Sequence, residues 1–209
     1  MSWWERRVVP RLVEASLSSP EVAERRALVC AGLTGSVLEL GFGSGLNIGH
    51  YPPGVRRVDA VEPSDLAWDL SAQRRGRARV PIERVGLDGQ RLDAEAATYD
   101  AVLSTFTLCT IPDVDRALAE VRRVLRPGGS LHFLEHGLAP DPRVQTWQRR
   151  LEPVQRRVAG GCHLTRDVPE ALAEAGLVPT SLEQGYLPGP SLGRPFTYCS
   201  AGRAREPAD

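Results

Sequence analysis

The sequence predicts an α/β protein with one mostly parallel sheet of seven strands, a C-terminal antiparallel hairpin and additional N-terminal helices. Three observations support this fold class. Short apolar segments alternate with helical patterns over most of the chain, an order that gives a parallel sheet through right-handed crossovers. A turn dense in glycine directly follows the first apolar segment. Near the C-terminus, a stretch rich in glycine and proline separates the last two apolar segments, as in a hairpin.

The chain has the size of a single domain. It contains 209 residues, of which 42% are hydrophobic and 25% charged, enough for a substantial core but too few residues for two typical domains. We expect a helical cap at residues 1–35 and the sheet domain at residues 36–203. Within the sheet domain, residues 138–165 form an insertion longer than an ordinary connection, and such connections tend to be functional.

The N-terminal helices are predicted from the spacing of apolar residues and from the residues that interrupt this spacing. Residues 3–31 carry apolar positions three and four apart, interrupted at Pro10 and at Ser18-Ser19-Pro20, so they predict two short helices. Residues 36–40 are apolar enough for a first buried strand. Residues 46–50 then open a helix, which the following prolines end.

The middle of the chain repeats this alternation. A second strand is expected at residues 58–61, followed by a helix through residues 64–77 that Ser64 caps. Residues 80–85 and 99–104 predict the third and fourth strands. Residues 114–125 form a well-patterned helix, which a Pro-Gly-Gly sequence terminates.

The last part completes the sheet. A fifth strand is expected at residues 130–134, and after the insertion a helix at residues 165–175. The final two strands, at about 179–184 and 195–202, are separated by residues 185–194, whose glycines and prolines suit a hairpin.

Charge and composition exclude several classes of function. Lys+Arg and Asp+Glu both total 26, so no basic field indicates a nucleic-acid partner. The four cysteines are far apart in sequence and form no CxxC pair, which predicts neither a disulfide framework nor a metal site. No signal peptide is evident, and no stretch approaches the ~20 apolar residues that cross a bilayer. We therefore expect a cytoplasmic monomer or homodimer with no stable membrane insertion.

The glycine-dense turn indicates the cofactor. It reads E-x-G-x-G-x-G, with Glu39 followed by Gly41, Gly43 and Gly45. A dinucleotide loop instead reads G-x-G-x-x-G and seats a pyrophosphate on a helix N-terminus. Here the carboxylate precedes the glycines, where it would repel a pyrophosphate and attract a cationic amino-acid group. The pattern therefore favours S-adenosylmethionine.

Two further turns extend the predicted cofactor site. Glu62 ends the second strand, 21 residues after Gly41, where a carboxylate can accept hydrogen bonds from both ribose hydroxyls. We prefer this role to that of a solvated carboxylate. The turn Asp88-Gly89-Gln90 follows the third strand, and its acid or amide could bond an adenine amino group. An ordinary turn explains Asp-Gly equally well.

A series of segments resembles a known family. VLELGFGSGLN, VEPS, STFTLCTIPD, EVRRVLRPGGSLHFLEHG and GGCHLTRD occur in this order over nearly the whole chain. They resemble the class I S-adenosylmethionine-dependent methyltransferases, which have a Rossmann-like sheet. The third to fifth segments contain narrower motifs, similar to those of small bacterial proteins related to the animal methyltransferase-like alkyl thiol S-methyltransferases.

The resemblance implies roles for individual residues. It implies that S-adenosylmethionine is the cofactor, with S-adenosylhomocysteine as product, and that the cofactor contacts Glu39, Gly41, Gly43, Gly45, Asn47, Glu62, Pro63, Asp88, Gly89, Gln90 and Thr105. The acceptor would contact Trp3, Thr107, Cys109, Trp147 and Arg166. For Cys109 we prefer a packing role, since free cysteine behaves as a buried hydrophobic residue, whereas packing and substrate contact explain Trp3 equally well.

The chemistry of methyl transfer limits which classes of acceptor are expected. His136 and His163 are the candidate bases, since histidine titrates near neutral pH. A thiol with a pKa near ~8.5 supplies some thiolate at neutral pH, whereas an aliphatic alcohol needs a strong base. The sequence shows no unambiguous set of base residues, which favours sulfur or amine acceptors. Together with the resemblance, this leads us to expect S-methylation of a small-molecule thiol, such as a natural product or xenobiotic. The alternatives are N- or O-methylation of a natural product, phospholipid or quinone, and a non-catalytic cofactor-binding protein.

Overall fold

Seven strands form one mixed sheet in the order β3-β2-β1-β4-β5-β7-β6 in the computed structural model, which describes residues 3–207 apart from the side chain of Glu5. Strands β1 to β5 run parallel, whereas β7 is antiparallel to both β5 and β6. The strands are β1 (Gly35–Leu40), β2 (Val55–Val61), β3 (Ile82–Gly86), β4 (Tyr99–Thr105), β5 (Leu125–His136), β6 (Val178–Tyr186) and β7 (Tyr198–Arg205). The predicted fold class is confirmed. Because the strand order reverses between β1 and β4, a ligand is expected at the carboxyl ends of these two strands.

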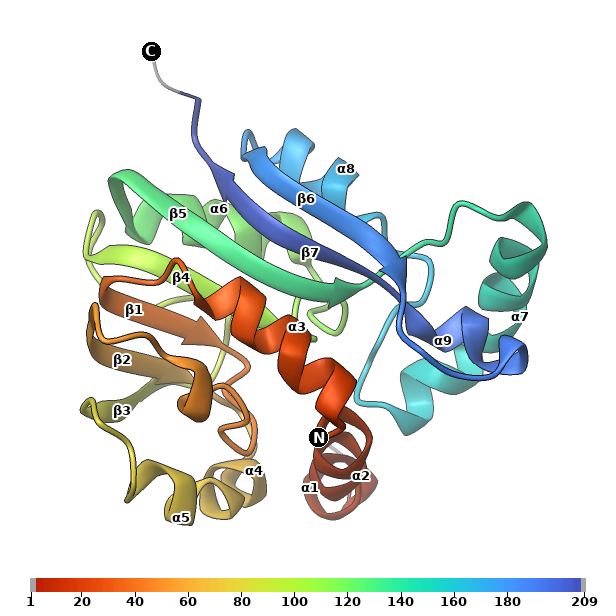
Figure 1. The fold of residues 1–209 in the computed structure, drawn as a ribbon, viewed down its shortest axis with the longest axis horizontal. Helices are drawn as coiled ribbons and strands as arrows, with labels where there is room; N and C mark the ends of the chain where they lie inside the picture. The colour runs from red at the N-terminus through yellow and green to blue at the C-terminus, as the bar shows by residue number, and fades with distance from the viewer. Residues whose placement is uncertain (1–2, 208–209) are drawn as a thin grey trace.

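Helices cover both faces of the sheet. In Figure 1, α3 crosses the near face, while α6 and α8 lie behind the sheet. The helices are α1 (Trp3–Arg7), α2 (Val9–Leu17), α3 (Pro20–Cys30), α4 (Asp65–Leu70), α5 (Ala72–Arg75), α6 (Val114–Val124), α7 (Pro142–Val158), α8 (Val168–Glu174) and α9 (Arg194–Thr197), with 3-10 turns η1 (Ile48–His50) and η2 (Ser191–Gly193). None of the helices within residues 3–207 has both the length and the apolar character needed to cross a bilayer.

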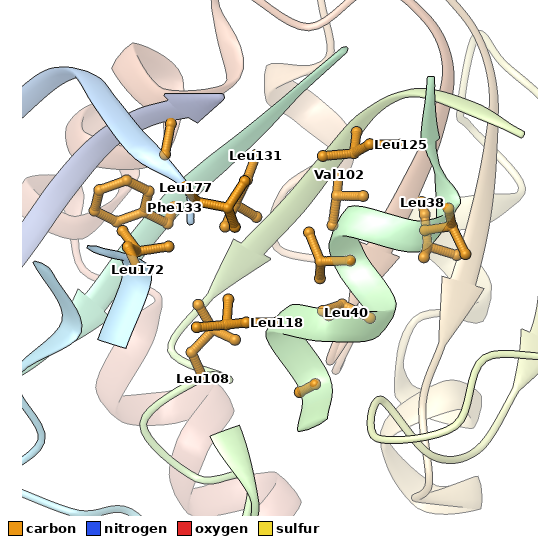
Figure 2. Close-up of a cluster of buried hydrophobic side chains, with 14 of the residues drawn as sticks. Leu38, Leu40, Val102, Leu108, Leu118, Leu125, Leu131, Phe133, Leu172 and Leu177 are labelled. Atoms are coloured by element: carbon orange, nitrogen blue, oxygen red, sulfur yellow. The ribbon is translucent and has the colours of Figure 1, made fainter. Parts of the chain in front are cut away.

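The larger core cluster lies between the sheet and the pair α6 and α8. Helix α6 turns Ala117, Leu118, Val121 and Val124 inward as one stripe, the pattern of an amphipathic helix. Figure 2 shows Leu118 near Leu108, with Val102 and other strand residues in the same cluster. This packing holds the strand ends, and the loops that follow them, in a fixed arrangement.

The N-terminal helices lie beside the edge where the ligand is expected. Helices α1 and α2 both contact α4. Glu14 of α2 pairs with Arg74 of α5 at 2.9 Å, and Arg74 also donates to the carbonyl of Ser44 in the glycine turn at 3.0 Å. The helices thus reach the glycine turn through one arginine. Residues 1 and 2 of the predicted cap lie outside the described residues.

Several predicted elements differ in the structure for local reasons. Residues 3–31 form three helices, because Pro10 lies in the first turn of α2, where proline is tolerated. Residues 46–50 form only the turn η1, since Pro52 and Pro53 follow at once and Tyr51 is extended. The predicted helix 64–77 divides at Ser71, whose hydroxyl donates to the carbonyl of Trp68 at 2.6 Å.

The C-terminal half also departs from expectation. Strand β5 begins at Leu125, before the Pro-Gly-Gly sequence, with a register shift against β4. The expected insertion contains the 17-residue helix α7, which Asp141 caps. Strand β7 begins only at Tyr198, because Pro195 belongs to α9, and so η2 and α9 replace a tight hairpin turn.

Candidate active site

The glycine turn after β1 needs glycine for two different reasons. Gly41, Gly43 and Gly45 have φ values of 64°, 59° and 78°, in the left-handed region that other residues rarely adopt. A Cβ atom on Gly41 would lie 2.0 Å from Oγ1 of Thr107, in the loop after β4. A Cβ atom on Gly43 would meet only one carbonyl oxygen, at 3.9 Å. The turn is therefore packed tightly against the β4 loop at Gly41 and is open at Gly43.

Glu39 is fully buried beneath this turn. Its carboxylate accepts hydrogen bonds from Nδ2 of Asn47 at 2.9 Å and from the hydroxyl of Tyr51. Burial raises the pKa of the carboxyl to about 7, against the opposing effects of these two bonds and of the Arg26 charge. A cation placed beside Glu39 would favour its ionised form. The geometry suits the ammonium group of an amino acid.

Arg26 is a site residue that sequence reasoning missed. It comes from α3, is only 4% exposed, and donates through Nη1 to Oδ1 of Asn47 at 2.8 Å and to Oγ1 of Thr105 at 2.7 Å. Its Nε is buried without a partner. The signal was present in the sequence, because Arg26 interrupts a helical stripe otherwise formed by buried Val22, Val29 and Cys30.

Glu62 joins the end of β2 to the glycine turn. Its carboxylate oxygens accept from the backbone N–H of Gly43 at 2.6 Å and of Ser64 at 2.7 Å. Burial raises the pKa of this carboxyl. Since a carboxylate oxygen has two acceptor sites, each can still receive a ribose hydroxyl. Pro63 follows on the surface.

The loop after β3 forms the turn expected of its sequence. Oδ1 of Asp88 accepts from the backbone N–H and from Nε2 of Gln90, at 2.9 and 3.1 Å. A Cβ atom on Gly89 would lie 3.1 Å from Cδ1 of Ile111 and 3.7 Å from Cδ2 of Leu40. The turn is thus observed, and it lies against apolar side chains of the same edge. Its adenine contacts stay a prediction.

The loop after β4 is held in a strained conformation. Phe106 has a φ of 54°, which is rare for a residue other than glycine. The buried carboxylate of Glu135 accepts from the backbone N–H of Thr107 at 3.1 Å and of Cys109 at 3.2 Å, and from the Ser104 hydroxyl at 2.7 Å. Such strain persists only where the surroundings impose it, and it is common at functional sites.

Three potential metal ligands, distant in sequence, meet beside this loop. Cys109, His136 and Cys162 each contribute one side-chain ligand atom, and these atoms all lie within 4.8 Å of one another. The Sγ atoms of Cys162 and Cys109 are 3.8 Å apart, and Sγ of Cys162 is 3.7 Å from Nδ1 of His136. Burial opposes protonation of His136, but its contacts with Cys162 and Cys199 outweigh burial and raise its pKa. The spacing of the cysteines gave no sign of this group.

The second candidate base and the candidate substrate arginine have structural partners. Nδ1 of His163 lies 3.2 Å from Oε1 of Glu152, and burial lowers the pKa of this histidine. Nη1 of Arg166 donates to the carbonyls of Leu108 and, at 2.7 Å, Ile111. Arg166 therefore braces the β4 loop, and its contact with substrate stays a prediction.

The predicted aromatic substrate contacts are exposed side chains, and their contact with substrate stays a prediction. Trp3 is 72% exposed and Trp147 is 53% exposed, on α1 and α7. The two helices do touch, because the indole of Trp4 donates to the carbonyl of Val158 at 3.3 Å. By contrast, Glu39, Asn47 and Thr105 share one hydrogen-bonded group, and Thr107 packs on Gly41.

Comparisons with known proteins agree with this geometry. Residues 38–133 match a family described as a methyltransferase domain. The chain is 35% identical over 172 residues to thiol S-methyltransferase TMT1A of Homo sapiens, covering 78% of this chain and 68% of that protein. It is 35% identical over 152 residues to thiol S-methyltransferase TMT1B of Rattus norvegicus, covering 71% of this chain and 62% of that protein, so it spans roughly two thirds of these relatives.

A solved structure agrees at the level of the fold. The crystal structure of an S-adenosylmethionine-dependent methyltransferase from Aquifex aeolicus superposes with a TM-score of 0.63 at 15% identity, covering 93% of this chain and 97% of that one. The chain belongs to the class I methyltransferases, and its cofactor is S-adenosylmethionine.

Proposed function

We propose that this methyltransferase transfers the methyl group of S-adenosylmethionine to the sulfur of a small-molecule thiol. One observation carries the choice of acceptor: the chain is 35% identical, over 78% of its length, to a protein named as a thiol S-methyltransferase. The position of the acceptor is supported separately, because the loop after β4 contacts the glycine turn directly through Thr107 and Gly41. The acceptor then lies along residues 105–109, on the methyl-donating side of the cofactor.

The side chains of this site act mainly by positioning. Methyl transfer to sulfur is an in-line displacement in which charge is dispersed, so alignment and exclusion of water contribute most. In this proposal Glu39 holds the ammonium group of the cofactor and Glu62 holds its ribose. Phe106 and its neighbours shape the acceptor side, since the Phe106 ring lies 4.9 Å from that of His136. Of the two candidate bases, His136 is the one that contacts this ring.

The experiment uses S-adenosylmethionine with a labelled methyl group and a panel of thiols, phenols, amines and lipids. We expect label in the alkyl thiols. Glu62→Gln should weaken cofactor binding and lower transfer with it, whereas Glu24→Gln, the same change at an exposed position of α3, should retain both. Transfer to phenols or amines with all thiols inert would refute the proposed acceptor class.

A further inference from the structure

Two glycines bring the thiols of the Cys109, His136 and Cys162 group together. Gly160 and Gly161 have φ values of 62° and 92°, and a Cβ atom on Gly161 would lie 3.0 Å from the carbonyl oxygen of Thr110. Only glycine permits this approach of the segment after α7 to the β4 loop. The backbone N–H of His163 then donates to the carbonyl of Cys109 at 2.8 Å, which fixes the neighbouring Cys162 in place.

Two of the three distances within the group match a tetrahedral zinc site, and the third is below 4.8 Å. With Zn–S about 2.3 Å and Zn–N about 2.0–2.1 Å, a tetrahedron separates two sulfur ligands by about 3.8 Å and a sulfur from a nitrogen by about 3.6 Å. The separations here are 3.8 Å between the two Sγ atoms and 3.7 Å between Sγ of Cys162 and Nδ1 of His136. Thiolate and imidazole donors together select zinc over the hard cations that prefer oxygen.

The surroundings support the ligands in the way metal sites require. The carboxylate of Glu135 accepts a hydrogen bond from the backbone N–H of Cys109, with Oε2 and N 3.2 Å apart. Cys199 lies opposite His136 in the β5–β7 ladder, which fixes the backbone of His136 in the sheet. Such fixed surroundings orient metal-binding side chains. Cys199 is not itself one of the grouped ligands. Among the described residues, the ligand atoms that all lie within 4.8 Å of one another belong to Cys109, His136 and Cys162, which makes three protein ligands.

We propose that Cys109, Cys162 and His136 bind a Zn²⁺ ion whose fourth position takes the sulfur of the thiol acceptor. Structural zinc sites have four protein ligands, whereas three protein ligands leave a position for substrate. The site also lies on the correct side of the molecule, because the Phe106 ring beside His136 belongs to the loop that contacts the glycine turn. The proposal replaces the sequence-based expectation of no metal site, and its acceptor half rests on the proposed function.

The chemistry balances without a further reactant. The acceptor thiol binds zinc and releases its proton to solvent, since a coordinating thiol is deprotonated. An electron pair of the bound sulfur forms the new bond to the methyl carbon. The old sulfur–carbon bond of S-adenosylmethionine breaks, and its electron pair stays on S-adenosylhomocysteine. The thioether formed is a neutral and weaker ligand, so it leaves the metal.

The test starts from the reduced, metal-free chain of 209 residues. Zn²⁺ is titrated in competition with a coloured chelator, and Co²⁺ serves as a spectroscopic probe. We expect one Zn²⁺ per chain and a sulfur-to-cobalt charge-transfer band. Both should be lost in Cys162→Ser and His136→Ala, and both should persist in Cys30→Ala, which removes a buried thiol of α3 outside the group. S-adenosylmethionine binding, expected to persist in Cys162→Ser, shows that this variant folds.

The acceptor position is tested on the cobalt-loaded protein. Adding an alkyl thiol should shift the cobalt d–d bands of the wild type, with or without cofactor. An unchanged spectrum would overturn the acceptor position even if methylation of thiols is observed. Failure to bind one Zn²⁺ per chain, or equal binding by Cys162→Ser, would overturn the metal site. If zinc binds but no thiol is methylated, the metal site stands and the proposed function fails.

Discussion

Glu39→Gln removes a buried charge while keeping the shape of the side chain. The carboxyl group of Glu39 is completely buried, and burial raises its pKa from 4.5 to about 7. The groups that face it are the donors Tyr51 and Asn47, the cation Arg26 of α3 and the carboxylate of Glu62 at the end of β2. The variant therefore separates the charge of Glu39 from its packing.

The sign of the pH effect follows from the raised pKa. Well below pH 4.5 the carboxyl is protonated in both the folded and the unfolded chain and contributes no pH dependence. As the pH rises to about 7, the unfolded chain ionises while the folded chain keeps its proton. The free energy of unfolding therefore falls by up to about 3 kcal/mol, and it falls no further at higher pH. The Glu39→Gln variant has no carboxyl group at this position, so its free energy of unfolding should not fall for this reason.

Urea unfolding of the cofactor-free proteins at pH 5 and pH 8 measures the difference. Between pH 5 and pH 8, the free energy of unfolding of the wild type should fall by about 2–3 kcal/mol more than that of Glu39→Gln. Glu24→Gln, at an exposed position, should behave as wild type. The same pH dependence in wild type and Glu39→Gln would refute the burial of a titrating carboxylate at this position.

Cofactor binding gives a second measure of the same charge. If the ammonium of S-adenosylhomocysteine pairs with ionised Glu39, the ratio of wild-type to Glu39→Gln affinity should rise about tenfold from pH 6 to pH 8. The ligand's own amino group titrates equally in both series, so the ratio isolates Glu39. Calorimetric titration provides the affinities, and a constant ratio would contradict the pairing.

Three further substitutions test other parts of the site. Gly41→Ala places a Cβ atom 2.0 Å from the Thr107 hydroxyl at a φ of 64°, and should weaken S-adenosylmethionine binding at least about tenfold in calorimetry; unchanged affinity would refute the tight contact. Arg26→Met leaves the buried Oδ1 of Asn47 without its donor and removes one of the two donors to Oγ1 of Thr105, so it should lower the free energy of unfolding by about 1–3 kcal/mol in urea; wild-type stability would argue against this bridge. Glu62→Gln should cost about 1.5–3 kcal/mol of cofactor binding, or about 10- to 150-fold in Kd, and an equal Kd would exclude the ribose role.

The sequence allowed the fold and much of the cofactor side of the site to be predicted, because both depend on local patterns. Apolar runs mark buried strands, and a residue that directly follows such a run must lie at the carboxyl edge of a parallel sheet. Glu62 follows β2 in this way, and Gly41 follows β1. Their nearness in space, seen in the bond from Gly43 to Glu62, follows from the adjacency of the two strands.

The remaining features depend on contacts between distant segments. Cys109 and Cys162 are 53 residues apart in the chain, so no spacing rule could bring their thiols together. The left-handed backbone conformation of Phe106 is imposed by the hydrogen bonds of the surrounding loop. The conformational propensity of a single residue does not predict it. Arg26 resembles a surface helix residue until its position on the buried stripe of α3 is considered.

Single-turnover transfer from S-adenosylmethionine with a trideuterated methyl group tests the central claim most directly. Enzyme in excess of cofactor is mixed with an alkyl thiol, and both products are quantified by mass spectrometry. We predict equal amounts of S-adenosylhomocysteine and of a thioether that carries the trideuterated methyl group on sulfur. Bound cofactor that yields neither product, or S-adenosylhomocysteine formed without the thioether, would contradict methyl transfer to a thiol.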